Sequence, residues 1–259
     1  MALAAKGTKR RPVKAPQTPC DRCPLRKLEI FRKFTSAELK FMQGFKQGEL
    51  ALQAGSTVLA EGTNSPHLYT VLSGWAFKYK TLEDGRRQVL NFALPGDLLG
   101  LQNSVFDTMG HSIESLTDIV LCTFPREKLW TVFQEHTGLA FDVTWLASRE
   151  EAILGDYLLT VGQRRAGERI AFILLHLFRR ARQIGLVHDN TVVFPFTQDH
   201  LADAIGFSLV HTNKTLKRLL ATGYFKWANS RFKLMDENGL AALVGGSATS
   251  ASDGLRPFL

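Results

Sequence analysis

Two short helices separated by a single glycine are predicted in the last quarter of the chain, and this segment constrains the fold more than any other. Thr197 can cap the first helix, and Ser208 can cap the second, which is expected over residues 209–221. Gly206 lies between them, where the turn requires a residue that tolerates positive φ. Ala202 is small enough for two helices to cross closely. The pattern predicts a helix-turn-helix.

The second helix is expected to present its outward face to the major groove of duplex DNA, where Asn can pair with adenine and Lys with guanine or phosphate. From Ser208 to Lys233 there are six Lys or Arg residues and no Asp or Glu. A helical hairpin that only packs would usually mix both signs, so this run favours phosphate binding. Two short strands joined at Asn229-Ser230 follow as a wing. The residues predicted to contact DNA are Gln198, Ser208, Val210, His211, Asn213, Lys214, Lys217, Arg218 and Arg231.

Before this segment, the spacing of apolar residues is typical of strands up to Pro125 and typical of helices after it. Short apolar stretches separated by glycine turns fill residues 56–124. Residues 75–80 alternate aromatic and other side chains, as a half-buried strand does, and the Asp-Gly pair at 84–85 is a strong hairpin signal. Evenly spaced short strands of this kind predict a barrel, a sandwich or a jelly roll.

A long helix is predicted over residues 137–163, followed by a second over about 166–183. Apolar residues of the long helix recur at spacings of three, four and seven, which is typical of a helix that packs along another helix. Glu150 interrupts the stripe, and an ordinary amphipathic helix packed on its own domain is the alternative. The predicted dimer contacts are Leu139, Val143, Leu146, Ile153 and Tyr157.

Composition adds little to the argument for DNA, because the excess charge is unevenly placed. The formal net charge is +8, but residues 1–19 carry five Lys or Arg and no acidic residue, so this segment is expected to be a disordered basic arm. No apolar run matches a secretory signal or a membrane span, and we expect a cytoplasmic protein without a membrane partner. Three cysteines, an odd number, argue against a disulfide framework.

The order of these parts resembles the CRP/FNR family of regulators, over about residues 20–243. The stretches LYTVLSG at 68–74, PGD at 95–97 and AGERI at 166–170 are similar to that family, as is QDHLADAIGFSLVHTNKTLKRL at 198–219. The resemblance implies an α+β protein with an N-terminal cyclic-nucleotide-binding-like β-roll (jelly roll), a long dimerisation helix and a C-terminal winged helix-turn-helix.

The same resemblance implies a function and a division into domains. A homodimer would read a palindromic operator with helix 209–221, the β-roll would sense a signal, and RNA polymerase would be a partner. The family's best-known recognition helices carry Glu and Arg where this chain has Val210 and Lys214, so their half-sites do not transfer. The expected domains are a disordered arm at 1–19, a sensor at 20–136, the dimerisation helix at 137–163, the DNA-binding domain at 164–245 and a flexible tail at 246–259.

The sequence does not identify the signal that the β-roll would sense. Cyclic-nucleotide members of the family use a glycine-glutamate start and an Arg-Ser or Arg-Thr pair, and residues 100–112 contain neither, so cyclic AMP is not expected. Cys20, Cys23 and Cys122 resemble three of the four iron–sulfur ligands of the oxygen-sensing branch, and Glu29 stands at about the distance of a fourth. Zinc, a reversible disulfide, and Cys122 as a buried small hydrophobe are the alternatives.

No catalytic constellation is present in the sequence, and we expect no enzyme. The histidines show no HxH or HxxxH spacing, and no GxSxG motif, phosphate-cradling loop or pair of catalytic carboxylates occurs. The leading hypothesis is a sequence-specific DNA-binding regulator with an unidentified signal. The alternative is a small-molecule-binding β-roll, or a β-roll enzyme, with a helical appendage.

Overall fold

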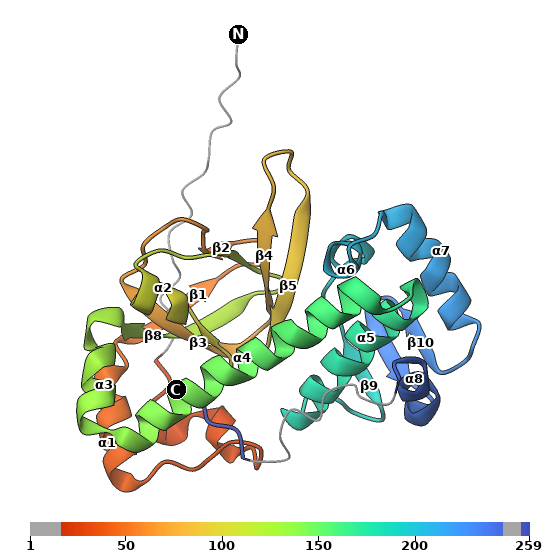
Figure 1. Ribbon diagram of the computed structural model, residues 1–259. Coiled ribbons are helices and arrows are strands. Elements are labelled where there is room, and N and C mark those ends of the chain that lie inside the picture. Colours follow the sequence, from red (N-terminus) through yellow and green to blue (C-terminus); the bar gives the residue numbers. More distant parts are fainter. Residues whose placement is uncertain (1–16, 246–254) are drawn as a thin grey trace.

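A β-roll and a winged-helix part are joined by one long helix in the computed structural model, which describes residues 17–245 and 255–259 (Figure 1). The α-helices of the described chain are α1 Ser36–Phe45, α2 Leu101–Phe106, α3 Leu129–Glu135, α4 Thr137–Gln163, α5 Ala166–Gln183, α6 Gln198–Ile205, α7 Leu209–Leu220 and α8 Glu237–Leu243. Short 3₁₀ turns lie at Cys20–Arg22, Pro24–Lys27 and Arg126–Lys128. The predicted basic arm lies largely outside the described residues.

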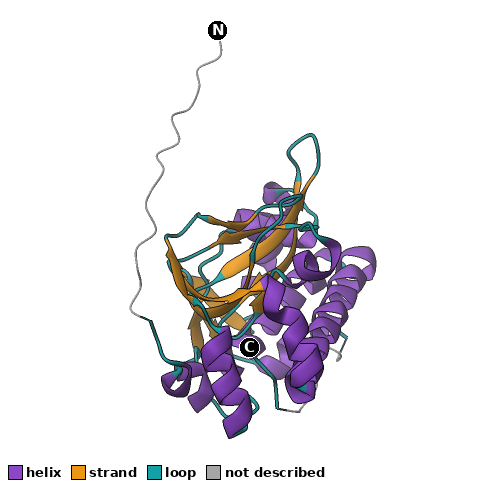
Figure 2. Ribbon diagram, turned by 90° about the vertical axis from the view of Figure 1, so that its left-hand side faces the viewer, coloured by secondary structure: helices purple, strands orange, loops and turns teal. Residues whose placement is uncertain are grey.

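The β-roll consists of two antiparallel four-stranded sheets, as expected from the evenly spaced short strands (Figure 2). One sheet has the order β1-β8-β3-β6, with bounds Gly48–Leu52, Ile119–Pro125, His67–Ser73 and Leu98–Leu99. The other has the order β2-β7-β4-β5, with bounds Thr57–Leu59, Ser112–Ser115, Ala76–Thr81 and Arg87–Ala93. The strand order brings residues that are far apart in the sequence into one body.

The hairpin predicted at Asp84-Gly85 is present between β4 and β5, with Gly85 at a φ of 84°. The burial of β4 differs from the expected half-buried alternation, because Phe77 and Lys78 are both buried. Lys78 is covered because its ammonium group lies 2.9 Å from Glu150 of α4. This strand therefore has elements of the protein on both of its faces.

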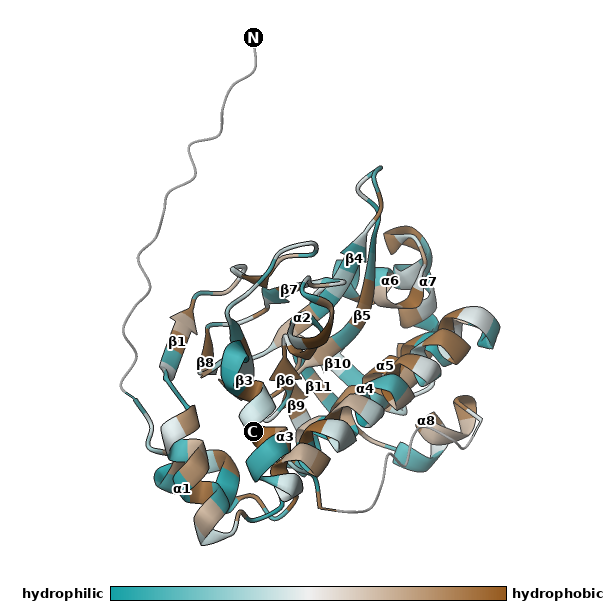
Figure 3. Cartoon of the chain, turned by 60° about the vertical axis from the view of Figure 1, so that its left-hand side comes forward, coloured by the Kyte–Doolittle hydropathy of each residue, from teal (hydrophilic) through white to brown (hydrophobic). Residues whose placement is uncertain are grey.

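Helix α4 runs from the neighbourhood of α1 and α3, past the β-roll, to α6 (Figures 1 and 3). Arg32 anchors the beginning of α4 to the N-terminal region, since its guanidinium bonds both Asp142 and Glu38. Glu38 also forms a capping box with Thr35 at the start of α1. The helix thus connects the N-terminal region to the C-terminal part through packed and charged contacts.

The winged-helix part consists of α5–α8 and a three-stranded sheet with the order β10-β11-β9, with bounds Phe225–Ala228, Arg231–Leu234 and Thr191–Val193. The predicted wing is confirmed as β10 and β11. Its turn residues Asn229 and Ser230 have φ values of 51° and 61°, as a tight two-residue hairpin requires. The third strand was not predicted from the sequence.

The expected flexible tail is wrong for its last five residues, while residues 246–254 lie outside the described chain. Phe258 and Leu259 are buried, and Phe258 packs 4.8 Å from the ring of Phe31. Arg256 is 5% exposed and exchanges backbone hydrogen bonds with Ile30 and Arg32. Aromatic burial and these hydrogen bonds, neither visible as a local pattern, hold the segment against the N-terminal region.

Among the helices in the described parts of the chain, none combines the length and apolar character that crossing a membrane requires.

Candidate nucleic-acid interface

The two capped helices and their glycine turn have the geometry that the sequence predicted. Thr197 Oγ1 accepts a hydrogen bond from the backbone N–H of His200 at the start of α6, and Ser208 Oγ accepts one from His211 at the start of α7. Gly206 has a φ of 71° and ends α6 in the left-handed region. The turn therefore depends on a residue without a Cβ.

Packing separates the inward and outward faces of α7. Leu216 and Leu219 are buried, and Thr212 and Thr215 also occupy inward positions. Ala202 of α6 is 4% exposed, in agreement with a close crossing. Since the inward face is filled by apolar and threonine side chains, the polar residues of α7 are left on the opposite side.

Eight of the nine residues predicted to contact DNA are exposed, and they come from α6, α7, the α7 cap and the wing. They are Gln198, Ser208, Val210, His211, Lys214, Lys217, Arg218 and Arg231. Val210 is 79% exposed, which is unusual for a large apolar side chain and leaves it available to contact a thymine methyl group.

Asn213 is the exception. It is half-buried, and its Oδ1 is buried without a hydrogen-bond partner among the described residues. Bidentate pairing with adenine uses both the amide oxygen and the amide nitrogen, so the side chain has to turn outward for that contact. Lys214, one residue further on, is already exposed.

The positive charge of this surface is uncompensated. All six cations between Ser208 and Lys233 are exposed, and none of them pairs with a carboxylate within the part of the chain that the structure describes. The additional cations of the wing, Lys226 and Lys233, lie on β10 and β11. We define this set of α7 and wing residues as the cationic face.

Helix α6 is fixed against the hairpin of the β-roll. Arg87 of β5 pairs with Asp203 at 2.8 Å, and the amide of Gln88 donates to the Ala204 carbonyl at 3.2 Å. The ring of His200 lies edge-on to Phe77 of β4, with centroids 4.8 Å apart. Burial, followed by nearby Arg87, lowers the pKa of His200. A movement of the hairpin would therefore move the helix-turn-helix.

A buried charge cluster, which the sequence analysis missed, joins four parts of the chain. Asp97, in the turn before β6, accepts from Arg180 of α5 at 2.5 Å and from Arg256, and it lies 3.5 Å from Arg149 of α4. We call these four residues the Asp97 junction. The three guanidinium groups hold the pKa of the Asp97 carboxyl far below its usual range despite its burial. Only the Pro-Gly-Asp turn was recognisable in the sequence.

The residues predicted to form the dimer seam face the wrong way for that role. Each of them is buried in the single chain, with exposed fractions from 0% to 8%, so the narrow stripe packs against the chain's own core. They are Leu139, Val143, Leu146, Ile153 and Tyr157. The alternative given above, an amphipathic helix packed on its own domain, is correct for these five residues.

A different apolar face of α4 remains open. Leu158 is 75% exposed and Leu154 is 39% exposed on this face, whereas Phe141, which is 69% exposed, projects from another side of the helix. Ala147, Leu154, Leu158 and Val161 follow one another at spacings of seven, four and three, the repeat of a helix seam. A shallow groove lined by Gly155 and its neighbours lies along the same face.

The three cysteines come together at one small cavity of about 30 Å³, although they are distant in the sequence. Burial raises the pKa of Cys20 and Cys23, and raises that of Cys122 to about 12. The thiols are thus protonated at neutral pH. Phe258 and Leu259 also line this cavity and help to exclude water from it.

The predicted four-ligand metal set is not assembled. Glu29 is exposed and does not line the cysteine cavity. In residues 17–245 and 255–259 no group of three or more His, Cys, Asp or Glu side chains is placed to hold a metal ion. The donor set therefore does not fit an iron–sulfur cluster or a zinc ion.

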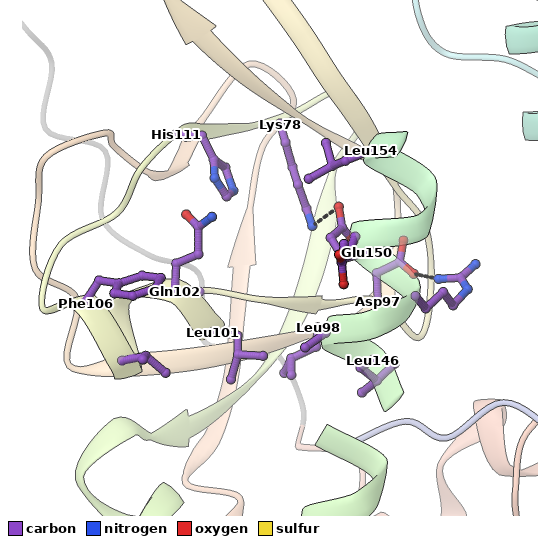
Figure 4. A pocket seen from close by; sticks show the side chains of 15 residues that line it. Lys78, Asp97, Leu98, Leu101, Gln102, Phe106, His111, Leu146, Glu150 and Leu154 are labelled. Carbon is purple, nitrogen blue, oxygen red and sulfur yellow. Dashed lines mark ion pairs between the residues drawn. The ribbon is translucent and has the colours of Figure 1, made fainter. Parts of the chain in front are cut away.

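The β-roll and α4 enclose a larger cavity of about 350 Å³ (Figure 4). Residues 100–112, which would carry the acid and the arginine of a cyclic-nucleotide site, contribute Gln102 and His111 instead. Asn103, beside them, is fully buried and donates to the Ser65 carbonyl. These residues do not fit a cyclic nucleotide, because the ribose and phosphate partners are missing.

Comparison with protein families gives two matches, in the order of the two parts of the fold. Residues 49–136 match the model of the cyclic nucleotide-binding domain, and residues 168–243 match the model of the Crp-like helix-turn-helix domain.

Curated relatives are similar over most of the chain. The nitrogen fixation regulation protein FixK of Bradyrhizobium diazoefficiens is 28% identical over 225 residues, covering 87% of this chain and 93% of the relative. The transcriptional activator protein FnrL of Cereibacter sphaeroides is 26% identical over 221 residues, covering 84% and 88%.

Solved structures agree on the fold. FixK2 from Bradyrhizobium japonicum has a TM-score of 0.69 at 24% identity and covers 75% of this chain and 96% of its own. A transcriptional regulator of the CRP family from Thermus thermophilus, TTHB099, has a TM-score of 0.65 at 22% identity, with coverages of 78% and 99%. With both domain matches and full-length relatives in agreement with the exposed helix-turn-helix, this chain is a DNA-binding transcription regulator of the CRP/FNR family.

Proposed function

We propose that two copies of the chain form a homodimer that reads a two-fold-symmetric operator with α7 of each subunit. The cationic face is the observation that carries this proposal, since exposed and unpaired cations beside a capped helix suit a phosphate backbone. In this motif the first turns of the second helix enter the major groove. Val210 and Lys214 would then contact base edges, with Ser208, Lys217 and Arg231 at the backbone.

The exposed face of α4 supports the dimer. Leu154 and Leu158 leave apolar side chains exposed on one face of α4, and the seam repeat that they share with Ala147 and Val161 suits a second α4. A parallel pairing related by a two-fold axis would place two α7 helices on one side of the assembly. The half-site spacing would then follow from the subunit geometry.

The cavity between the β-roll and α4 is the proposed sensor. Strand β4 separates it from the DNA-binding part, with Lys78 lining the cavity and Phe77 contacting His200 of α6. Occupation of the cavity would bias the position of this strand, and therefore of α6 and α7. RNA polymerase is a further proposed partner, and a regulator that reads chromosomal DNA would act in the bacterial cytoplasm.

Selection of binding sites from a random duplex pool tests the proposal. The full-length protein should enrich a palindromic sequence, and the double variant Asn213→Ala/Lys214→Ala should lose that preference while retaining its melting temperature. Lys40→Ala, which removes an exposed cation far from α7, is the matched control and should select the same sequence. Unchanged selection by the double variant would reject the assignment of α7 as the reading helix.

A further inference from the structure

The last residues of the chain return to the N-terminal region and dock there. Helix α8 belongs to the winged-helix part, whereas residues 255–259 lie beside the N-terminal region (Figure 1). The backbone N–H of Arg256 donates to the Ile30 carbonyl at 2.6 Å, and the Arg256 carbonyl accepts from the N–H of Arg32 at 2.8 Å. These bonds form a short parallel bridge at Phe31. We call residues 255–259 the C-terminal strap.

The end of the strap closes the cavity at which the cysteines meet. Phe258 and Leu259 are 5% and 4% exposed, and both line this cavity of about 30 Å³ together with Cys23 and Cys122. Stacking on Phe34, with ring centroids 5.4 Å apart, holds Phe258 in the wall. A space of this size admits about one or two water molecules, so a larger reagent reaches these sulfur atoms only after part of the wall moves. A docked chain end is the part of a wall that opens most easily.

The third cysteine is more accessible. Cys20 lines the small cavity, but it is only half-buried and also lines an open depression with Gln17 and Gly48. A reagent in solution can therefore reach Cys20 without passing the strap. Its thiol provides an internal reference for the two cysteines that the strap covers.

Arg256 is the latch of the strap. Its guanidinium pairs with Asp97 Oδ1 and donates to the Gly96 carbonyl at 3.0 Å. It also lies over the ring of Phe31, 5.4 Å from the centroid. Because Arg256 is 5% exposed, the docked strap without Asp97 would bury an unpaired charge. Docking therefore depends on this ion pair.

The same carboxylate oxygen has a second candidate partner on α4. Nη1 of Arg149 lies 3.5 Å from Asp97 Oδ1, the oxygen that Arg256 holds. Arg180 of α5 holds the other oxygen at 2.5 Å. A charge-assisted hydrogen bond is usually about 2.7–2.9 Å long, so Arg149 is displaced from its best position. Burial, followed by the charge of Arg256, lowers the pKa of Arg149 to about 9. The two arginines thus compete for one oxygen.

We infer that the C-terminal strap is a reversible lid over Cys23 and Cys122, latched by Arg256 on Asp97 and opposed by Arg149. When the strap leaves, Arg149 can move onto the vacated oxygen while Arg180 stays on the other one. The carboxylate then keeps two cationic partners, so opening the lid does not leave a buried charge unpaired. The open form makes Cys23 and Cys122 a modification site for thiol-reactive small molecules, and the closed form hides it.

The test is N-ethylmaleimide labelling of the full-length protein, with mass spectrometry of each cysteine over time. Cys20 should be labelled first. The double variant Phe258→Ala/Leu259→Ala should label Cys23 and Cys122 about tenfold faster or more, because local opening limits access to buried thiols, and should change Cys20 much less. Unchanged protection of the two covered cysteines would overturn the lid. Equal acceleration of all three would show general loosening of the region and would also overturn it.

Two substitutions at the Asp97 junction test the latch and its competitor. Arg256→Gln should raise the labelling rate of Cys122 about tenfold or more, because the latch is lost. Arg149→Gln should lower that rate, because the competitor for Oδ1 is removed. Opposite effects are not expected if both arginines only stabilise the fold. Acceleration by both variants, or by neither, would overturn the competition.

The controls keep these outcomes separate from misfolding. Arg86→Gln, on the exposed tip of the β4–β5 hairpin, is the matched arginine control and should leave all three labelling rates unchanged. Melting temperatures of all variants should lie above the labelling temperature. If Arg256→Gln does not fold, Phe258→Ala alone, which leaves the ion pairs of the junction in place, should still accelerate the labelling of Cys122. Its failure to do so would overturn the lid.

Discussion

The cationic face and the Asp97 junction are built from the same kinds of residue and have opposite electrostatic settings. On α7 and the wing, six cations are exposed and unpaired in the described chain. In the junction, Arg149, Arg180 and Arg256 are largely removed from solvent and share one carboxylate. Water solvates and screens exposed cations, so they are stable without a carboxylate partner and remain free to bind a macromolecular anion. Buried cations instead require a partner inside the fold. Burial, and not residue type, decides which role a basic residue takes.

Asp97→Asn gives the largest expected effect, because it removes the one carboxylate that three arginines share. Breaking a buried ion pair by removal of one partner typically costs about 3–5 kcal/mol, so the free energy of unfolding should fall by about that amount. Denaturant unfolding monitored by circular dichroism measures it. Asp84→Asn, in an exposed pair with Arg86, is the matched control and should leave the midpoint in place. Equal denaturant midpoints for Asp97→Asn and Asp84→Asn would contradict the contrast between buried and exposed charges.

The same contrast between buried and exposed positions holds for leucines on two faces of α4. Leu139 is 0% exposed and Leu158 is 75% exposed. Leu139→Ala should lower the free energy of unfolding of the subunit by about 2–4 kcal/mol, through lost burial and a cavity. Leu158→Ala should instead weaken the dimer, as measured by sedimentation at several concentrations. If Leu139→Ala gave a monomer whose subunit stability was normal, the buried stripe that contains Leu139 would be the dimer interface after all.

Removal of one cation from the cationic face has the smallest expected effect. Lys217→Ala should leave the melting temperature unchanged and weaken binding to all duplex sequences alike. If Lys217 neutralises one phosphate per subunit, the slope of log K against log salt should fall in magnitude by about 2 for a dimer. Fluorescence anisotropy at several salt concentrations provides the measurement, with Lys40→Ala as the control. An unchanged slope would remove Lys217 from the phosphate contacts.

Local patterns were sufficient for the helix-turn-helix and misleading for α4. Caps at Thr197 and Ser208 and the turn at Gly206 depend on backbone geometry within a few residues, so the sequence alone predicts them. A helical stripe at Leu139 and Val143 shows that one face is buried, but it carries no information about what covers that face. The covering surface was the chain's own core.

The start of α1 carries a local signal in the sequence, whereas α2 carries none. Thr35 and Glu38 have the spacing of a capping box, which the structure confirms at the start of α1. By contrast, α2 is only six residues long and carries no such cap, which explains why it was missed.

The sequence by itself determined the order of the parts, the two capped helices with their glycine turn, and the surplus of positive charge between Ser208 and Lys233, because caps, turns and periodicity are local properties of the backbone. Tertiary structure decided the open face of α4, the gathering of three cysteines without Glu29, and the junction of Asp97 with Arg149, Arg180 and Arg256. Those contacts join residues up to 159 positions apart. Their energies depend on burial and distance, which exist only after the chain has folded.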